Sequence, residues 1–175
     1  MAHIENDEAF EMLKSLHDPR DGRTELRVKN LVGVLEEVPT NLFWPVFLNT
    51  WPNCDQTWPF QKKLLRMLRH HAGQEPAINY MHPGANEFFS LLPPMVIVFR
   101  GCAAGCSLGV SWTTTQNVAK QFALEHSGRR LNQVLATAKI DKKHIFAVCV
   151  ERGESEIILD PKYLQELQLS ALAAD

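Results

Sequence analysis

The sequence predicts an α+β protein, in which a helical N-terminal region (residues 1–92) is followed by a compact β-rich core (residues 93–175). Two observations support this division. In the first half, apolar residues recur at helical spacing between capping residues and prolines. From residue 95 onward, short apolar stretches rich in β-branched residues replace that pattern. A chain of 175 residues is long enough to bury a substantial core.

The first part of the helical region predicts two amphipathic helices. Asn6 is expected to cap a helix that extends to about His17, and Thr24 is expected to cap a second helix that Pro39 closes. The residues expected on the buried faces are Phe10, Leu13 and Leu16/His17 in the first helix and Leu31, Leu35 and Val38 in the second.

Trp-Pro recurs at positions 44, 51 and 58 in the middle of the helical region. Three copies at this spacing are too few for a repeat architecture. Since proline is favoured at the first turn of a helix, we interpret the pairs as aromatic anchors at helix starts, with a partner-binding surface as the alternative. A short helix is predicted over ANEFFSLL (85–92).

Thr57 is predicted to open a strongly amphipathic helix with a basic face. The expected apolar stripe is Phe60, Leu64, Met67 and Leu68; the expected basic residues are Lys62, Lys63, Arg66, Arg69 and His70. A solvated basic face is the simpler interpretation. Attraction to an acidic partner or to nucleic-acid phosphate is the alternative.

Five strands are predicted in the second half. MVIVF (95–99) and IFAVCV (145–150) have the continuous apolar character of strands buried on both faces, whereas VLATAKI (134–140) alternates more. GVSWTT (109–114) and EIIL (156–159) are the other two. One helix interrupts them at TQNVAKQFALEH, with Val118, Phe122 and Leu124/Glu125 expected on its buried face.

The composition is that of an ordinary globular chain: 45% of residues are hydrophobic, 22% are charged and the net charge is −2. No apolar stretch is long enough to span a bilayer, and the first residues lack the pattern of a secretory signal, so no membrane association and a cytoplasmic location are expected. Four cysteines do not require a disulfide framework. The x3 spacing of Cys102 and Cys106 favours ordinary thiols over a metal site, and no metal is predicted.

Three polar motifs are predicted at the ends of the strands. Arg100 directly follows MVIVF and precedes Gly101, a pairing that suits binding of phosphate or ribose oxygens. Ser111 and Thr113 are two residues apart, so their hydroxyls share one face of a strand. Glu154 and Glu156, in the segment ERGESEIILDP, are predicted by the same alternation to share a face. Each motif alone is more often structural than functional.

Taken in order, these motifs resemble those of the Arg-Ser-Glu class of mono-ADP-ribosyltransferases, the cholera-toxin-like and exoenzyme-like enzymes. In that class an arginine closes the first core strand, a Ser-Thr-Ser-like strand leads into a helix with an A..FA signature, and Glu-x-Glu opens a late strand. Here VFRG, SWTTTQNVAKQFA and GESEIILDP follow in that order over residues 95–161. The resemblance implies a core of two small packed sheets, with no counterpart for residues 1–90.

The resemblance also implies an activity: transfer of ADP-ribose from NAD to a macromolecular acceptor. Glu156 would stabilise the positive charge that develops on the ribose, and Ser111 would orient Glu156. Arg100 would bind the phosphates or the nicotinamide ribose. Glu154 would activate the acceptor, for which an arginine side chain is favoured and a nucleic acid remains open. The remaining residues predicted to line the NAD site are Gly101, Trp112, Thr113 and Phe122.

Two departures from the family pattern affect what is expected. The middle motif is SWT, which retains both hydroxyls but leaves the role of the tryptophan open. The turn ERG is short beside the target-recognising loop of many relatives, so this departure concerns target selection rather than chemistry. Such relatives are often bacterial or phage toxins or effectors, some held by an antitoxin or regulatory protein, and the same context is expected here.

Other functions remain as alternatives to the transferase. The same residues would serve an NAD glycohydrolase, in which water replaces the acceptor. A catalytically inactive NAD-binding or partner-binding module would act through the Trp-Pro segment and the basic helix. The glycines at 101, 105 and 109 form G-x3-G-x3-G, which matches neither the dinucleotide-binding fingerprint nor the P-loop.

Overall fold

The computed structural model of the protein describes residues 24–54, 57–125, 132–150 and 153–172. The chain divides into two compact units, Met1–Met81 and His82–Asp175. This division falls about ten residues before the predicted one, because the short helix after Met81 contacts a strand of the β-rich unit. The helix predicted from Asn6 to His17 lies outside the described residues.

Three α-helices form the described part of the helical unit: α2 (Thr24–Glu37), α3 (Thr40–Thr50) and α4 (Gln61–Gln74). Short 3-10 turns occur at Trp51–Asn53, Trp58–Phe60 and Ala77–Asn79. The aromatic residues Phe43, Trp44 and Phe47 of α3 are fully buried, and α2 contacts both α3 and α4. As predicted, Leu31, Leu35 and Val38 are buried, as are Leu64, Met67 and Leu68 of α4.

The Trp-Pro pairs differ in position. Trp51 and Trp58 each begin a 3-10 turn with proline in its first turn, as predicted. Trp44 does not, because Pro45 lies inside α3. There the proline removes one helical N–H donor. The Trp44 indole is fully buried and donates from Nε1 to the carbonyl of Glu75, 2.8 Å away, which ties α3 to the end of α4.

A buried histidine lies in the core of the helical unit. His71 of α4 is 8% exposed and stacks on Phe43, with ring centroids 3.8 Å apart. Its Nδ1 is buried without a hydrogen-bond partner. Burial and, secondarily, the charge of His70 lower the pKa of His71 from its usual value. The helical core therefore accommodates the neutral imidazole and disfavours the charged form.

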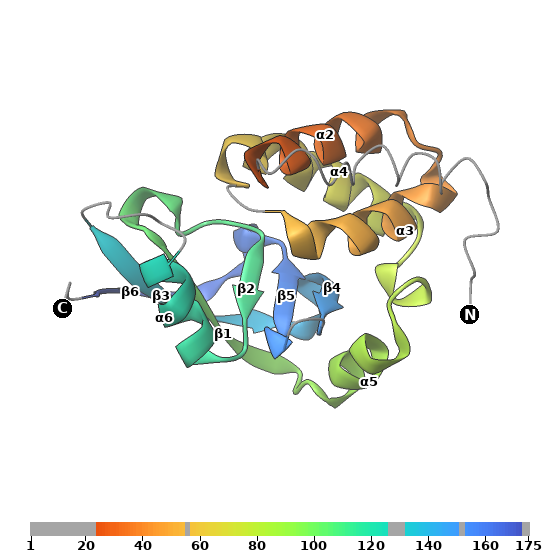
Figure 1. Ribbon diagram of the computed structural model, residues 1–175. Coiled ribbons are helices and arrows are strands. Elements are labelled where there is room, and N and C mark those ends of the chain that lie inside the picture. The colour runs from red at the N-terminus through yellow and green to blue at the C-terminus, as the bar shows by residue number, and fades with distance from the viewer. Residues whose placement is uncertain (1–23, 55–56, 126–131, 151–152, 173–175) are drawn as a thin grey trace. The chain divides into compact units, whose positions relative to one another are not determined.

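The β-rich unit is built on a six-stranded antiparallel sheet of order β4-β5-β2-β1-β3-β6 (Figure 1). The strands are β1 (Met95–Ala103), β2 (Ser111–Thr113), β3 (Gln133–Asp141), β4 (Ile145–Cys149), β5 (Glu156–Leu159) and β6 (Gln165–Ala171). Two helices accompany the sheet, α5 (Pro83–Leu91) and α6 (Gln116–Glu125). The α+β class predicted from the sequence is confirmed.

The described strands form one hydrogen-bonded sheet, where two packed sheets were predicted. β1 and β3 pair over nine residues, from Met95↔Asp141 to Ala103↔Gln133. β1 and β2 pair only at Phe99↔Thr113, although all three residues of β2 pair with β5. The sheet therefore consists of a β4-β5-β2 half and a β1-β3-β6 half. A single residue pair joins the two halves into one sheet.

Three predictions about the strands need correction. β1 is not buried on both faces, because Met95 and Ile97 are 41% and 53% exposed between buried valines. Arg100 does not close β1, which continues to Ala103 through its pairing with β3. The sixth strand, β6, was not predicted: Leu167, Leu169 and Ala171 alternate along it, but the pattern is short and all residues of the strand are exposed. β4, by contrast, is buried nearly throughout, as predicted.

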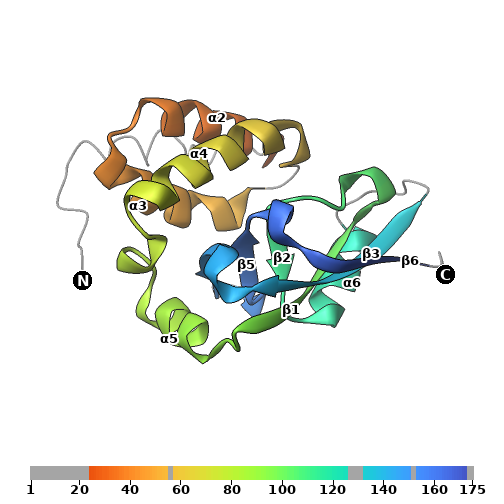
Figure 2. The same cartoon turned by 180° about the vertical axis from the view of Figure 1, so that it is seen from behind.

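Helix α6 covers one face of β1 and β3, as the opposite views of Figures 1 and 2 both show. Gly101 makes this close approach possible: a Cβ at that position would lie 1.8 Å from the carbonyl oxygen of Ala119. Ala119 and Ala123 are the buried residues of the helix, with Val118 and Phe122 half-buried. Leu124, predicted to be buried, is 58% exposed, because the small residues face the sheet.

Among the described residues, no helix is long and apolar enough to cross a membrane.

Replacing Gly101 by alanine is expected to destabilise the β-rich unit. The added methyl group would overlap the backbone of α6, and overpacking of this kind typically costs about 1–3 kcal/mol. Urea denaturation of Gly101→Ala and of Gly105→Ala measures the difference. A Cβ at Gly105 would meet no atom within 4 Å, so equal destabilisation by both variants would contradict the packing role of Gly101.

Acidification is expected to destabilise the helical unit through His71. Because the folded-state pKa lies below the unfolded value of about 6.5, the unfolded chain binds more protons. The stability that neutral His71 confers is therefore full above about pH 6.5 and decreases as the pH falls toward the folded pKa. His71→Leu should flatten the dependence of Tm on pH between about pH 7.5 and 5, whereas His70→Leu, at an exposed position, should leave most of it. Parallel wild-type and His71→Leu profiles would rule this out.

Candidate functional site

The centre of the candidate site is a hydrogen bond between β2 and β5. Ser111 Oγ donates to Glu156 Oε1 at 2.5 Å. The two strands are antiparallel, and their register pairs Ser111 with Ile158 and Thr113 with Glu156. Paired residues of an antiparallel sheet share a face, so Glu156 and Ser111 are diagonal neighbours on the same face. Both side chains are half-buried. The serine thus fixes the orientation of the carboxylate, as the resemblance implies.

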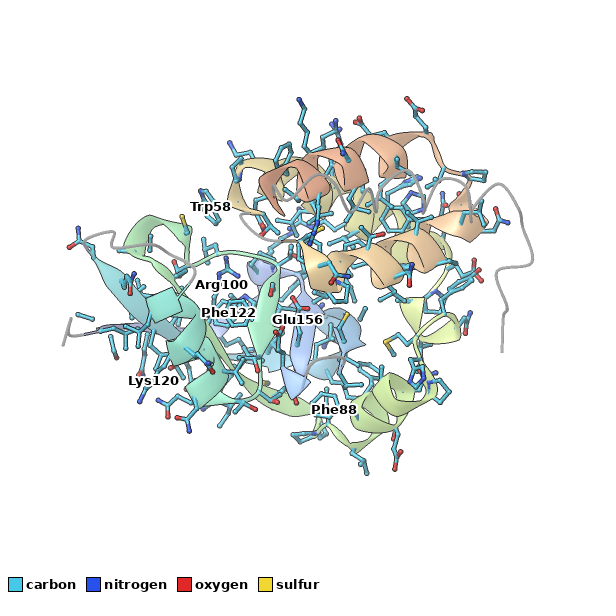
Figure 3. All side chains as sticks on the ribbon, viewed as in Figure 1. Trp58, Phe88, Arg100, Lys120, Phe122 and Glu156 are labelled. Atoms are coloured by element: carbon cyan, nitrogen blue, oxygen red, sulfur yellow. The ribbon has the colours of Figure 1, made fainter. Side chains whose placement is uncertain are left out.

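Arg100 joins this pair from β1. Its guanidinium donates from Nη1 to the backbone carbonyl of Ser111 at 2.6 Å and from Nε to that of Cys106 at 3.2 Å. These bonds connect β1 to β2 and to the 3-10 turn Ala104–Cys106. The guanidinium also lies close enough to Glu156 for the two opposite charges to interact. Arg100, Ser111 and Glu156, distant in sequence, therefore converge (Figure 3 labels the arginine and the glutamate).

The surroundings of the guanidinium are glycine and thiols. A Cβ on Gly109 would lie 2.4 Å from Arg100 Cζ, so the charged group occupies space that only glycine leaves open. Burial lowers the pKa of Arg100, while Cys102, Cys106 and Glu156 raise it. Burial likewise raises the pKa of the Cys102 thiol, against a lowering effect of Arg100. The arginine is thus partly desolvated, which strengthens its interaction with an anion.

Thr113 and the turn before β5 form a second connection. Thr113 Oγ1 donates to the backbone carbonyl of Glu154 at 2.7 Å and accepts from the N–H of Thr115 at 3.1 Å. β5 begins at Glu156, so Glu154 lies outside the strand. Ser155 has a φ of 45°, in the left-handed region. The predicted sharing of one face by the two glutamates assumed an extended backbone, and that assumption does not hold across Ser155.

Three further predicted residues serve the packing around the site. The Trp112 indole is buried on the face opposite Ser111 and Thr113, and its Nε1 donates to the carbonyl of Gly109 at 2.8 Å. Gly101 accommodates the backbone of α6. Phe122 of α6 is half-buried (Figure 3). Direct contact of these residues with a bound nucleotide stays a prediction, and for Trp112 the buried ring favours a structural role.

Residues that the sequence analysis did not select also belong to the site. Across the sheet, the register places Phe99 of β1 beside Thr113, and Cys149 of β4 beside Glu156. Gly109 holds the space of the Arg100 guanidinium. Only one weak feature of the sequence indicated the contact of Gly109 with Arg100: a glycine stands directly before VSWT. The cross-strand neighbours required the register, which no local pattern reveals.

Among the residues that the structure describes, no group of three or more His, Cys, Asp or Glu side chains could hold a metal ion. Comparisons of the chain with protein-family models, with curated proteins and with solved structures found no match. The interpretation of the site therefore depends on its own geometry and on the order of its motifs.

A methyl group at Gly109 is expected to displace the Arg100 guanidinium and break its bond to Ser111. Hydrogen bonds to charged groups contribute about 1.5–3 kcal/mol, so Gly109→Ala should lower the free energy of unfolding by a similar amount. A double-mutant cycle isolates the cause: in an Arg100→Ala background the same change should cost much less. Additive effects of the two substitutions in urea denaturation would show that the glycine and the arginine are not coupled.

Proposed function

We propose that this protein is an NAD-dependent mono-ADP-ribosyltransferase, which transfers ADP-ribose from NAD to a macromolecular acceptor. The observation that carries the proposal is the hydrogen bond from Ser111 Oγ to Glu156 Oε1, with Arg100 bound to the backbone of the same serine. The three motifs whose order resembles the Arg-Ser-Glu class thus supply side chains to one place. Structural ion pairs alone do not require a serine hydroxyl directed at the carboxylate.

The proposed chemistry breaks the bond between nicotinamide and C1′ of the ribose, and the electron pair leaves with nicotinamide. The positive charge that develops on the ribose is stabilised by the Glu156 carboxylate, which Ser111 holds in position. A lone pair of the acceptor then forms the new bond to C1′. Glu156 is the catalytic residue of this scheme, and Ser111 is a positioning residue.

Arg100 is proposed to bind the pyrophosphate or the nicotinamide ribose of NAD. A guanidinium has five N–H donors in a planar fork, and two of them bond the carbonyls of Cys106 and Ser111. Those bonds fix the plane of the group before a ligand arrives, which reduces the entropy cost of binding. Thr113 and Phe122 complete the proposed surroundings of NAD, with Thr113 holding the Glu154 turn, while Gly101 and Trp112 support the site through packing.

Glu154 is proposed to accept the proton that the acceptor loses. An arginine acceptor is protonated at neutral pH and needs such a base, which is why a guanidinium is the favoured target. The Thr113 bond to the carbonyl of Glu154 holds this residue next to the beginning of β5. If water takes the place of the acceptor, the same site acts as an NAD glycohydrolase.

Replacement of the two glutamates separates these reactions. With NAD labelled in its adenylate phosphate and a cell lysate as the source of acceptor, Glu156→Gln should lower both NAD cleavage and transfer by about 10²–10³-fold. Glu154→Gln should lower transfer while NAD cleavage continues, because only the acceptor step uses it. Ser111→Ala should have a smaller effect on kcat than Glu156→Gln, because the carboxylate remains.

The outcome also identifies the acceptor class. Label that protease releases indicates a protein acceptor, and label that nuclease releases indicates a nucleic acid. Labelled free ADP-ribose as the sole product would support the glycohydrolase instead. Equal rates for wild type and Glu156→Gln, or no turnover of NAD by either, would overturn the proposal and favour an inactive binding module.

A further inference from the structure

One face of α4 presents a row of cations. Lys62, Arg66 and Arg69 are all exposed. They are spaced four and three residues apart, and with 3.6 residues per turn this spacing places them on a single stripe of the helix. The opposite side contains the buried Leu64 and Leu68. The orientation of α4 in its own unit therefore turns these charges outward together.

The charges of α4 are not balanced within the helix. Gln61–Gln74 contains four Lys and Arg residues and neither Asp nor Glu, in a chain whose net charge is −2. Lys63, beside the stripe, pairs with Glu36 of α2 at 2.5 Å. Lys62 and Arg66 form an i,i+4 pair of like charge, which costs a few tenths of a kcal/mol, and Lys62 lies at the positive end of the helix dipole. An anionic ligand would offset both penalties.

An exposed tryptophan precedes the stripe in the chain. Three of the four tryptophans of the chain, Trp44, Trp51 and Trp112, are at most 2% exposed, but Trp58 is 38% exposed. Trp58 begins the 3-10 turn that leads directly into α4, four residues before Lys62. Figure 3 shows its ring at the surface of the helical unit. An exposed indole offers an apolar, planar surface on which a ligand could stack.

We propose that Trp58, Lys62, Arg66 and Arg69 form a binding site for single-stranded nucleic acid. Surfaces that bind single strands combine cations along the backbone with aromatic rings on which bases stack. The three cations span about 10 Å of helix, enough to contact a few phosphates, and the Trp58 indole stacks on an adjacent base. An acidic protein would use the cations and has no need of the indole. The inference concerns the helical unit by itself and does not depend on the proposed transferase activity.

The test is fluorescence anisotropy of the full chain with end-labelled, mixed-sequence 12-nucleotide RNA and DNA at several salt concentrations. With three phosphate contacts on a single strand, log Kobs should fall with log[salt] at a slope of about −2. Lys62→Gln/Arg66→Gln should make that slope shallower by about 1.4. Trp58→Leu should weaken binding about tenfold or more at every salt concentration without changing the slope, and Trp58→Phe should restore part of the loss.

Lys120→Gln/Lys143→Gln is the matched control, because it removes two exposed cations from the β-rich unit and leaves α4 intact. Its affinity should remain close to wild type, and thermal melting should show all variants folded. The RNA and DNA arms decide which strand is preferred. The proposal would be overturned if the control and the α4 double variant lost equal affinity, or if duplex competed as well as single strand. It would also be overturned if Trp58→Leu had no effect and poly-glutamate competed for the site.

Discussion

The junction of β1 and β2 is the constraint on which the candidate site depends. A single residue pair, Phe99↔Thr113, joins the two halves of the sheet. Arg100, the next residue of β1, adds a second connection by donating to the carbonyl of Ser111 at 2.6 Å. A partly desolvated charge thus lies where backbone pairing is shortest, and replacing the arginine would weaken both the sheet and the proposed site for NAD. Architecture and proposed chemistry use the same guanidinium.

The parts of the fold that the sequence predicts are those marked by a local pattern of apolar residues. The α+β division, the helix boundaries near Thr24 and Gln116 and five of the six strands at least in part follow from the local pattern of apolar residues. The hydrogen bond between Ser111 and Glu156 was predicted, but only through the order of the motifs. The continuation of β1 beyond Arg100 was not predicted, because it depends on pairing with β3. The alternation of Leu167, Leu169 and Ala171 in β6 is short and exposed, and it was missed.

Packing explains several of the remaining differences. Gly101 and Gly109 were both adjacent to predicted features, yet their roles follow from what approaches them: the α6 backbone in one case and the Arg100 side chain in the other. The Trp112 ring was open to interpretation from the sequence, and its bond to the Gly109 carbonyl places it in the framework behind the hydroxyls. The site therefore consists of a few polar groups supported by glycines and by one buried indole.

The conformation of Ser155 limits which sequences can occupy the turn between the two glutamates. A φ of 45° is disfavoured by about 1 kcal/mol for most residues, while glycine, asparagine and aspartate tolerate it best. A β-branched residue between Glu154 and Glu156 would have to change the backbone that sets the beginning of β5. The middle position of this Glu-x-Glu is therefore restricted by stereochemistry, although no role in catalysis is assigned to it. Fewer amino acids fit there than the letter x suggests.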